Sequence, residues 1–297
     1  MLKDQAMNRQ RQLTYITALV LVILLCLVGG WNPAYAADQK VFVLCYHTFL
    51  GNKRFGGDIS MQEFRSQLDY FQSKGFHFVS YADLLKGSAT GTRNLLLVID
   101  DGNQSAYPAY KEILKPRHIK PMFAIYPSII GKKSYALTWE QLEELSKDGC
   151  DIAAHGYYHE LVNQKFYDRD KKGFLKEIYG SKETLEKKLN IKVTAYVYPN
   201  GVRADMAKKT LKEAGYSYAF TITWGPVLSP LSLNKDPYEL SRYMIWRDHG
   251  KENWPMISGA ILKASANGGI NNAAITKVKT AVLGPRLKPG TLISDSQ

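Results

Sequence analysis

Residues 95–102 read Leu-Leu-Leu-Val-Ile-Asp-Asp-Gly, an unbroken apolar run followed by two carboxylates and a glycine. Such a run is typical of a strand buried on both faces, as in a parallel sheet that helices cover. Asp100 and Asp101 then stand at the carboxyl end of this strand, the edge where parallel α/β folds display ligand-binding and catalytic groups. The stretch predicts an α/β fold with chemistry at one sheet edge, although Asp-Gly alone is equally an ordinary turn.

Elsewhere in the chain, short apolar runs alternate with segments of helical period, which gives a β-α-β-α order. The expected strands are 41–46, 95–99, 122–126, 151–154, 194–198, 217–221 and 241–245. The expected helices are 60–74, 106–117, 138–147, 171–189 and 204–214. Seven strands with polar residues at several of their ends favour a distorted (β/α) barrel over an open doubly wound sheet.

Capping residues mark the helix boundaries. Ser60 precedes Glu63, and Thr138 precedes Gln141, at the spacing of a capping box. A glycine stands after each of three expected helices, where a left-handed cap is needed before the next strand. These glycines are Gly75, Gly149 and Gly215.

The first 36 residues differ from the rest. Basic residues precede an apolar run over 16–28, and the small-residue site Ala34-Tyr35-Ala36 follows. This pattern predicts a secretory signal peptide cleaved after Ala36. An uncleaved membrane anchor through residues 14–30 is the alternative. Either reading predicts an exported protein, in the periplasm, at the cell surface or secreted.

The chain is basic, with a formal net charge of +12, and residues 1–36 contribute +2 of this, which leaves +10. A positive balance favours anionic surroundings such as wall polymers or phospholipid headgroups, although a solvated lysine-rich surface explains scattered charges equally well. Export makes nucleic acid an unexpected partner.

We expect a monomer with one domain over residues 40–260, which hold no linker. A C-terminal extension with one short helix at 273–283 should follow over 261–297.

Cys45 and Cys150 are the cysteines outside the N-terminal segment. Both lie in apolar surroundings, one on an expected strand and one at a helix-to-strand turn. An oxidising compartment allows them to pair, but the surroundings favour two buried free thiols.

His155 and His159 follow the strand expected at 151–154, four residues apart. On one helical turn both imidazoles would point the same way and could hold one ion. With Asp101 they would supply two nitrogens and one oxygen and leave room for water and substrate, which is the pattern of a hydrolytic metal site. Of the two adjacent carboxylates, the other is then free to act as a general base.

A third strand end reads Tyr196-Val197-Tyr198-Pro199-Asn200-Gly201. Such a turn can present backbone N–H groups to a developing oxyanion, although Pro-Asn-Gly is also an ordinary turn.

Together these residues resemble the polysaccharide deacetylase, or NodB-homology, family, also called carbohydrate esterase family 4, over roughly Val41 to Asp248. Residues 98–102 are similar to the family's Thr-Phe-Asp-Asp-Gly motif, 155–159 to its His-Ser/Thr-x-x-His motif, and 198–201 to its Tyr-Pro-Tyr-Gly motif. Residues 236–242 resemble the Asp-Pro-x-x-Leu-x-Arg stretch of exported members, and Tyr46-His47 resembles their first barrel strand.

The resemblance implies a role for each matching position. Asp100 would be the general base, Asp101, His155 and His159 would be metal ligands, and the Asn200 N–H would bind the oxyanion. The implied activity is hydrolysis of N-acetyl groups on an amino-sugar polysaccharide, with the reacting polymer left open. Two imidazoles and a carboxylate make zinc the expected metal, although such a site admits other transition ions.

The chain departs from the family pattern at three places. Val197 stands where many members carry an arginine that orients the base, and Arg242 is the candidate substitute. Asn200 replaces an aromatic residue but keeps its backbone N–H. The late Leu-x-His motif, whose histidine is the general acid, is not recognisable, and His249 is a weak candidate for that role.

Five aromatic residues could line a floor for sugar rings, although aromatics at strand ends more commonly pack in the core. They are Tyr46, Trp139, Tyr157, Tyr158 and Trp224. The missing motif residues leave two other functions open: a catalytically weak module of the same fold that binds polysaccharide, and a membrane-tethered scaffold that holds anionic polymer.

Overall fold

The computed structural model describes residues 39–53, 55–248 and 251–266. The strands of the main sheet are, in chain order, β1 (Lys40–Tyr46), β2 (His77–Phe78), β3 (Asn94–Asp101), β4 (Met122–Ile125), β5 (Asp151–Ala154), β6 (Ala195–Val197), β7 (Tyr218–Phe220), β8 (Val227–Leu228) and β9 (Tyr243–Met244). A separate hairpin pairs β10 (Arg247–Asp248) with β11 (Lys251–Glu252).

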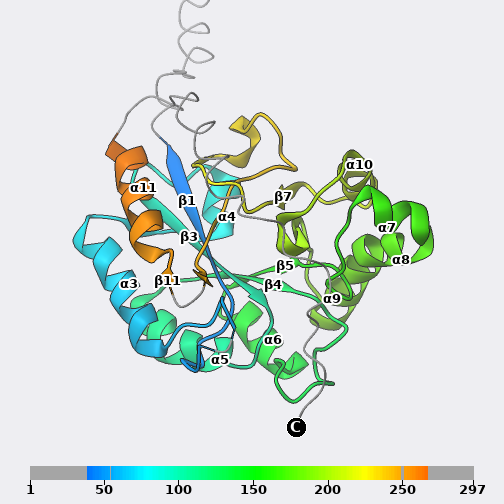
Figure 1. The fold of residues 1–297 in the computed structure, drawn as a ribbon, viewed down its shortest axis with the longest axis horizontal. Coiled ribbons are helices and arrows are strands. Elements are labelled where there is room, and N and C mark those ends of the chain that lie inside the picture. The colour runs from blue at the N-terminus through cyan, green and yellow to red at the C-terminus, as the bar shows by residue number, and fades with distance from the viewer. Residues whose placement is uncertain (1–38, 54, 249–250, 267–297) are drawn as a thin grey trace, which may run out of the picture.

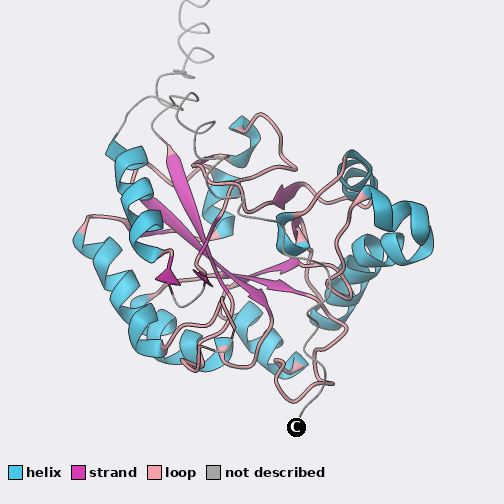
Figure 2. Ribbon diagram, viewed as in Figure 1, coloured by secondary structure: helices cyan, strands magenta, loops and turns pink. Residues whose placement is uncertain are grey.

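The helices lie around this sheet (Figures 1 and 2). The α-helices are α3 (Met61–Ser73), α4 (Tyr81–Lys86), α5 (Ala106–Ala109), α6 (Trp139–Lys147), α7 (Gln164–Arg169), α8 (Lys171–Leu175), α9 (Ser181–Leu189), α10 (Asp205–Glu213) and α11 (Trp254–Ala266). Short π- and 3₁₀-helical turns complete them: η1 (Tyr110–Leu114), η2 (Lys115–Arg117), η3 (Lys176–Gly180), η4 (Pro199–Gly201) and η5 (Leu231–Leu233).

Seven strands follow one another in the order β7-β6-β5-β4-β3-β1-β8, and β2 and β9 attach to β3 and β1. The pairs from β1 through β7 are parallel, and β8 is antiparallel to β1. The segment 237–245 crosses between the two ends of the sheet: Leu240 bridges Phe220 of β7, and β9 then pairs with Leu44 and Cys45 of β1. The sheet therefore curls into a distorted (β/α) barrel of about seven strands, as the sequence predicts.

The parallel strands bury both faces, and their side chains alternate between two apolar clusters. Residues 42, 44, 95, 97 and 99 join the outer cluster under the helices, whereas 41, 43, 96 and 98 join the inner cluster inside the curl. Continuing this alternation by one step along β3 directs Asp100 into the curl, at the carboxyl ends of the strands. The apolar run that predicts a buried strand thus also aims the first carboxylate inward.

The seven expected strands are confirmed, with ends that differ by a few residues, and all five expected helical segments are present. Two of these segments are interrupted: 106–117 continues from α5 into the π-turn η1 and the 3₁₀-turn η2, and 171–189 holds the π-turn η3 between α8 and α9. Both capping boxes are present, and Gly75, Gly149 and Gly215 have φ of 75°, 86° and 80°. Cys45 and Cys150 are buried and free. Among the described residues no helix is long and apolar enough to cross a membrane. The N-terminal segment 1–36, His249 and residues 273–283 lie outside the described residues.

Helix α11 is an element that the sequence pattern does not predict. It spans Trp254–Ala266 and places Ile257 and Ile261 in the outer cluster beside β1 (Figure 1). The helix crosses the boundary expected between residues 260 and 261 and extends to Ala266.

Candidate active site

The carboxyl ends of β3 and β5 bring three of the predicted site residues together. The Asp101 Oδ1 atom lies 3.5 Å from His155 Nε2 and 3.4 Å from His159 Nε2. The two imidazole Nε2 atoms are 3.1 Å apart. One oxygen and two nitrogens thus face a common point, as ligands of a single metal ion do.

The backbone between His155 and His159 differs from the helical turn that the sequence predicts. Residues 155–159 form an irregular loop rather than a helical turn, because Gly156 has φ of 78° and His159 has φ of 69°. Asp101 is also left-handed, with φ of 75°, and this breaks the strand alternation that would turn its side chain away from Asp100. Non-glycine residues rarely adopt this conformation, and such strain clusters at functional sites.

A backbone contact fixes the orientation of His155. Its Nδ1–H donates to the Val197 carbonyl oxygen on β6 at 2.7 Å. A proton therefore sits on Nδ1, and Nε2 is the atom that faces Asp101 and His159. Burial lowers the pKa of His155, but Asp100 and Asp101 outweigh it and raise the pKa above its usual value, so a metal at Nε2 would replace a proton there. In metal-binding histidines generally, a hydrogen bond from the ring nitrogen that does not bind the metal fixes the tautomer.

The residues present fit a divalent cation. Asp101 Oδ1 is buried and has no hydrogen-bond partner among the described residues, which is costly for a carboxylate oxygen unless a cation shares the space. Burial and the neighbouring His155 lower the pKa of His159 to about 4, so its ring is neutral at pH 7, as a ligand must be. Burial opposes ionisation of Asp101, but the surrounding histidines hold its pKa below the usual value.

Asp100 is paired with Arg242, which the segment 237–245 carries into the curl. Arg242 Nη1 donates to both Asp100 oxygens, at 2.8 and 2.9 Å, and Nε donates to the Thr221 carbonyl at 2.9 Å. Both side chains are almost fully buried. Burial raises the pKa of Asp100, but the Arg242 charge and His155 outweigh it, so the pKa lies below its usual value and the carboxylate is ionised.

Val197 occupies the position where many members of the resembled family carry the arginine that orients the base. Its side chain lies in the inner apolar cluster, and its carbonyl holds His155. The cation beside Asp100 comes instead from Arg242, 142 residues along the chain. Arg242 thus lies beside Asp100, and its role in orienting a base stays a prediction.

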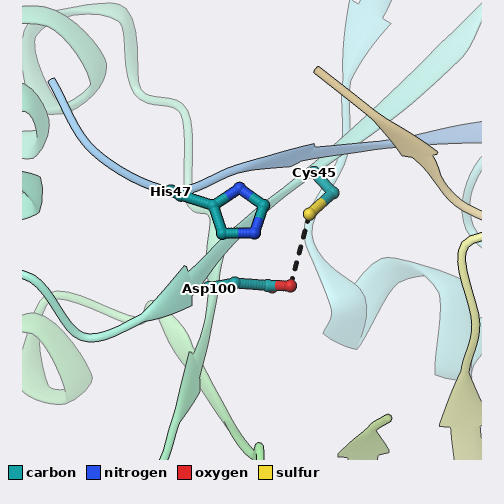
Figure 3. A group of neighbouring side chains, drawn as sticks. All are labelled: Cys45, His47 and Asp100. Carbon is teal, nitrogen blue, oxygen red and sulfur yellow. Dashed lines mark hydrogen bonds between the residues drawn. The ribbon is translucent and has the colours of Figure 1, made fainter. Parts of the chain in front are cut away.

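Two residues at the end of β1 complete the surroundings of Asp100 (Figure 3). The Cys45 thiol donates to Asp100 Oδ2 at 3.2 Å, and the His47 imidazole points toward the same carboxylate. Ligand atoms of Cys45, His47 and Asp100 lie within 4.8 Å of one another. A second metal is disfavoured here, because burial raises the pKa of Cys45 and the Arg242 cation already covers both Asp100 oxygens.

No sequence pattern assigns a catalytic role to His47. The imidazole is buried beside Phe55 and Trp246, and its Nδ1 atom has no hydrogen-bond partner among the described residues. The available signal was its position two residues after Cys45, because alternate residues of a strand share a face. That signal does not separate it from a packing histidine.

Asn200 lies in the 3₁₀ turn η4 at the carboxyl end of β6, with φ of 52°. The turn follows Val197, whose carbonyl holds His155, and so belongs to the same edge of the sheet. Its expected oxyanion contact stays a prediction.

The five expected aromatic residues do not form one floor. Tyr46 packs in the core against Phe64, and Trp224 packs against Tyr243. Tyr158, in the loop between the two histidines, is the exposed member at 58%.

The polysaccharide deacetylase family model matches residues 87–219. IcaB from Ammonifex degensii is 26% identical, with a TM-score of 0.64 over 75% of this chain and 97% of its own.

Two further solved structures share the fold. A polysaccharide deacetylase from Bacillus cereus is 19% identical, with a TM-score of 0.62 over 75% of this chain and 69% of its own. A de-N-acetylase from Aggregatibacter actinomycetemcomitans is 19% identical, with a TM-score of 0.61 over 75% and 99%. No curated protein sequence matches the chain.

Proposed function

We propose that the chain is a polysaccharide deacetylase, an amide-hydrolysing enzyme that removes N-acetyl groups from an amino-sugar polymer by a metal-dependent reaction. The observation that carries this proposal is the convergence of Asp101, His155 and His159 beside the ionised Asp100. Zinc suits two imidazoles and one carboxylate.

The proposed reaction assigns one task to each side chain. Asp101, His155 and His159 would hold a divalent metal, which would supply Lewis-acid activation of water and of the amide carbonyl. Asp100, kept ionised by Arg242, accepts the proton of the attacking water. The water oxygen bonds to the carbonyl carbon, and the Asn200 N–H stabilises the oxyanion. The C–N bond then breaks, which releases acetate and, after protonation of nitrogen, the free amine.

We assign protonation of the leaving amine to His47. Its ring lies beside Asp100 and turns Nε2 toward that carboxylate (Figure 3). His249, the weak candidate from the sequence, lies outside the described residues. An amine leaving group requires a proton donor, because the amide anion is too basic to depart unaided.

Metal removal is expected to abolish acetate release. Purified protein would be assayed on acetylated chito-oligosaccharides, peptidoglycan, poly-N-acetylglucosamine and small acylated sugars, before and after chelation. Returning stoichiometric Zn²⁺ should restore activity on at least one class, because the metal activates the water. A double variant, His155→Ala with His159→Ala, should stay inactive after zinc is returned. Polymer binding without acetate release from the metal-loaded protein would contradict the enzyme and support the weak binding module.

Replacement of His47 should affect amides more than esters. We expect His47→Gln to slow hydrolysis of the N-acetyl amide by about 10²- to 10⁴-fold, the usual contribution of a general acid. An aryl acetate, whose phenolate leaves without a proton, should be hydrolysed at nearly the wild-type rate. Parallel rate measurements on both substrates, at equal bound metal, test this. An equal loss on amide and ester would remove His47 from the role of acid.

We also propose that the chain is exported, on the strength of the basic, apolar and Ala-x-Ala pattern in residues 1–36. Fractionation of cells and N-terminal sequencing of the protein would separate cleavage after Ala36 from anchoring through residues 14–30.

A further inference from the structure

Glu177 is a fully buried carboxylate that the proposed reaction does not use. It lies in the π-helical turn η3, between α8 and α9 on the outer side of the sheet (Figure 1). Charged side chains are almost never fully buried unless several polar groups surround them.

The partners of Glu177 belong to the loop that carries the two histidines. Its Oε2 atom accepts the N–H groups of Tyr157 at 2.9 Å and Glu160 at 3.1 Å, and its Oε1 atom accepts that of Tyr158 at 2.9 Å. These residues lie in neither helix nor strand, so the loop has no ladder to satisfy its N–H groups. The Glu177 side chain thus accepts the backbone N–H groups that a helix or strand would otherwise pair.

Gly156 leaves the space that the Glu177 carboxylate occupies. A Cβ atom at this position would lie 2.4 Å from Glu177 Oε2, and φ of 78° disfavours any side chain there. The resembled motif carries serine or threonine between its first histidine and the following pair of residues. In this chain Gly156 stands at that position, and the Glu177 carboxylate fills the space that a side chain there would take.

The π-helical turn directs Glu177 toward the loop. The Ser181 hydroxyl donates to the Glu177 carbonyl at 2.7 Å, and the Tyr216 hydroxyl donates to the Ile178 carbonyl at 2.9 Å. Both carbonyls thus receive side-chain hydroxyls within the core. A π-turn changes the angle at which side chains leave a helix, and such turns are frequent at functional sites.

We propose that Glu177 is a positioning residue, whose carboxylate holds residues 155–159 in the left-handed loop that turns both histidine Nε2 atoms toward one ion. The proposal rests on the metal site of the proposed function. Burial raises the pKa of Glu177, and the three N–H donors lower it in part by favouring the charged form. Without the carboxylate, the strained backbone of His159 loses the contacts that offset its strain.

The test compares Glu177→Gln with Glu160→Gln. Both variants remove one negative charge near the site, but the Glu160 side chain is exposed and only Glu177 accepts the loop N–H groups. Glutamine offers one oxygen in place of two and turns an NH₂ group toward backbone donors. We expect Glu177→Gln to weaken Zn²⁺ binding by about 10- to 100-fold, as loss of an outer partner of a metal site usually does. Competition with a chromophoric chelator measures the affinity.

A second measurement does not depend on metal. Hydrogen–deuterium exchange of the metal-free protein should be faster in the peptide containing residues 157–160 of Glu177→Gln, and unchanged in Glu160→Gln. If Glu177→Gln does not fold, Glu177→Asp keeps the charge but retracts it by one methylene, and should show both effects. Wild-type affinity together with wild-type exchange in a folded Glu177 variant would overturn the proposal. If the wild-type protein bound no metal, the proposed function would be wrong. Hydrogen–deuterium exchange of residues 157–160 would still decide whether Glu177 holds the loop.

Discussion

Replacing Arg242 by methionine is expected to lower the free energy of unfolding by about 3–5 kcal/mol, because it leaves the buried Asp100 carboxylate without its cation. Both side chains are fully enclosed, and Nη1 contacts both carboxylate oxygens. Urea denaturation of the metal-free protein measures this loss without a contribution from bound metal. Deacetylation should fall as well, because Arg242 keeps the proposed base ionised and in place.

Two matched variants isolate the effect of the unpaired charge. Arg203→Met removes a guanidinium that bonds Glu239 at 2.9 Å in a pair about one third exposed, and should cost less than about 1 kcal/mol. Asp100→Asn combined with Arg242→Met removes both buried charges and should recover much of the stability while the protein stays inactive. Equal losses for Arg203→Met and Arg242→Met would show that Asp100 does not depend on its partner.

The features of the fold that the sequence predicts are those written in local patterns. The run 95–99 is apolar at every position because β3 is covered on both faces, and Ser60 with Glu63 forms the capping box that begins α3. Strands of two residues, such as β2 and β8, are too short to show the alternation of apolar and polar residues that marks a strand. Helix α11 was missed because its small and apolar residues show little amphipathic pattern beside the core.

The same distinction between local and distant residues applies to the candidate site. His155 and His159 are near in sequence, and with the Asp pair at a strand end they predict a metal-binding group from spacing alone. Arg242 was expected beside Asp100 only through a family resemblance, since no local pattern links residues 142 positions apart. The expected helical turn at 155–159 was wrong because the loop depends on Glu177, a tertiary partner that spacing does not report.

Adjacent carboxylates with different partners should respond differently to the same substitution. Asp100 binds Arg242 and Cys45, whereas Asp101 Oδ1 faces the two histidines. We expect Asp100→Asn to lower kcat by about 10²- to 10⁴-fold, the usual contribution of a general base, with little change in metal affinity. Asp101→Asn should instead weaken Zn²⁺ binding by more than about 100-fold, because a ligand matters more than the outer partners that support it.

Metal titration and acetate release, measured on both variants, distinguish the two roles. Excess zinc should restore part of the activity of Asp101→Asn, since the base at Asp100 and its Arg242 partner remain intact. No zinc concentration should rescue Asp100→Asn, whose amide cannot accept a proton from water at neutral pH. Circular dichroism must first show that Asp100→Asn is folded, because it leaves the buried Arg242 cation unpaired. If zinc rescued Asp100→Asn and not Asp101→Asn, the assignments of base and ligand would have to be exchanged.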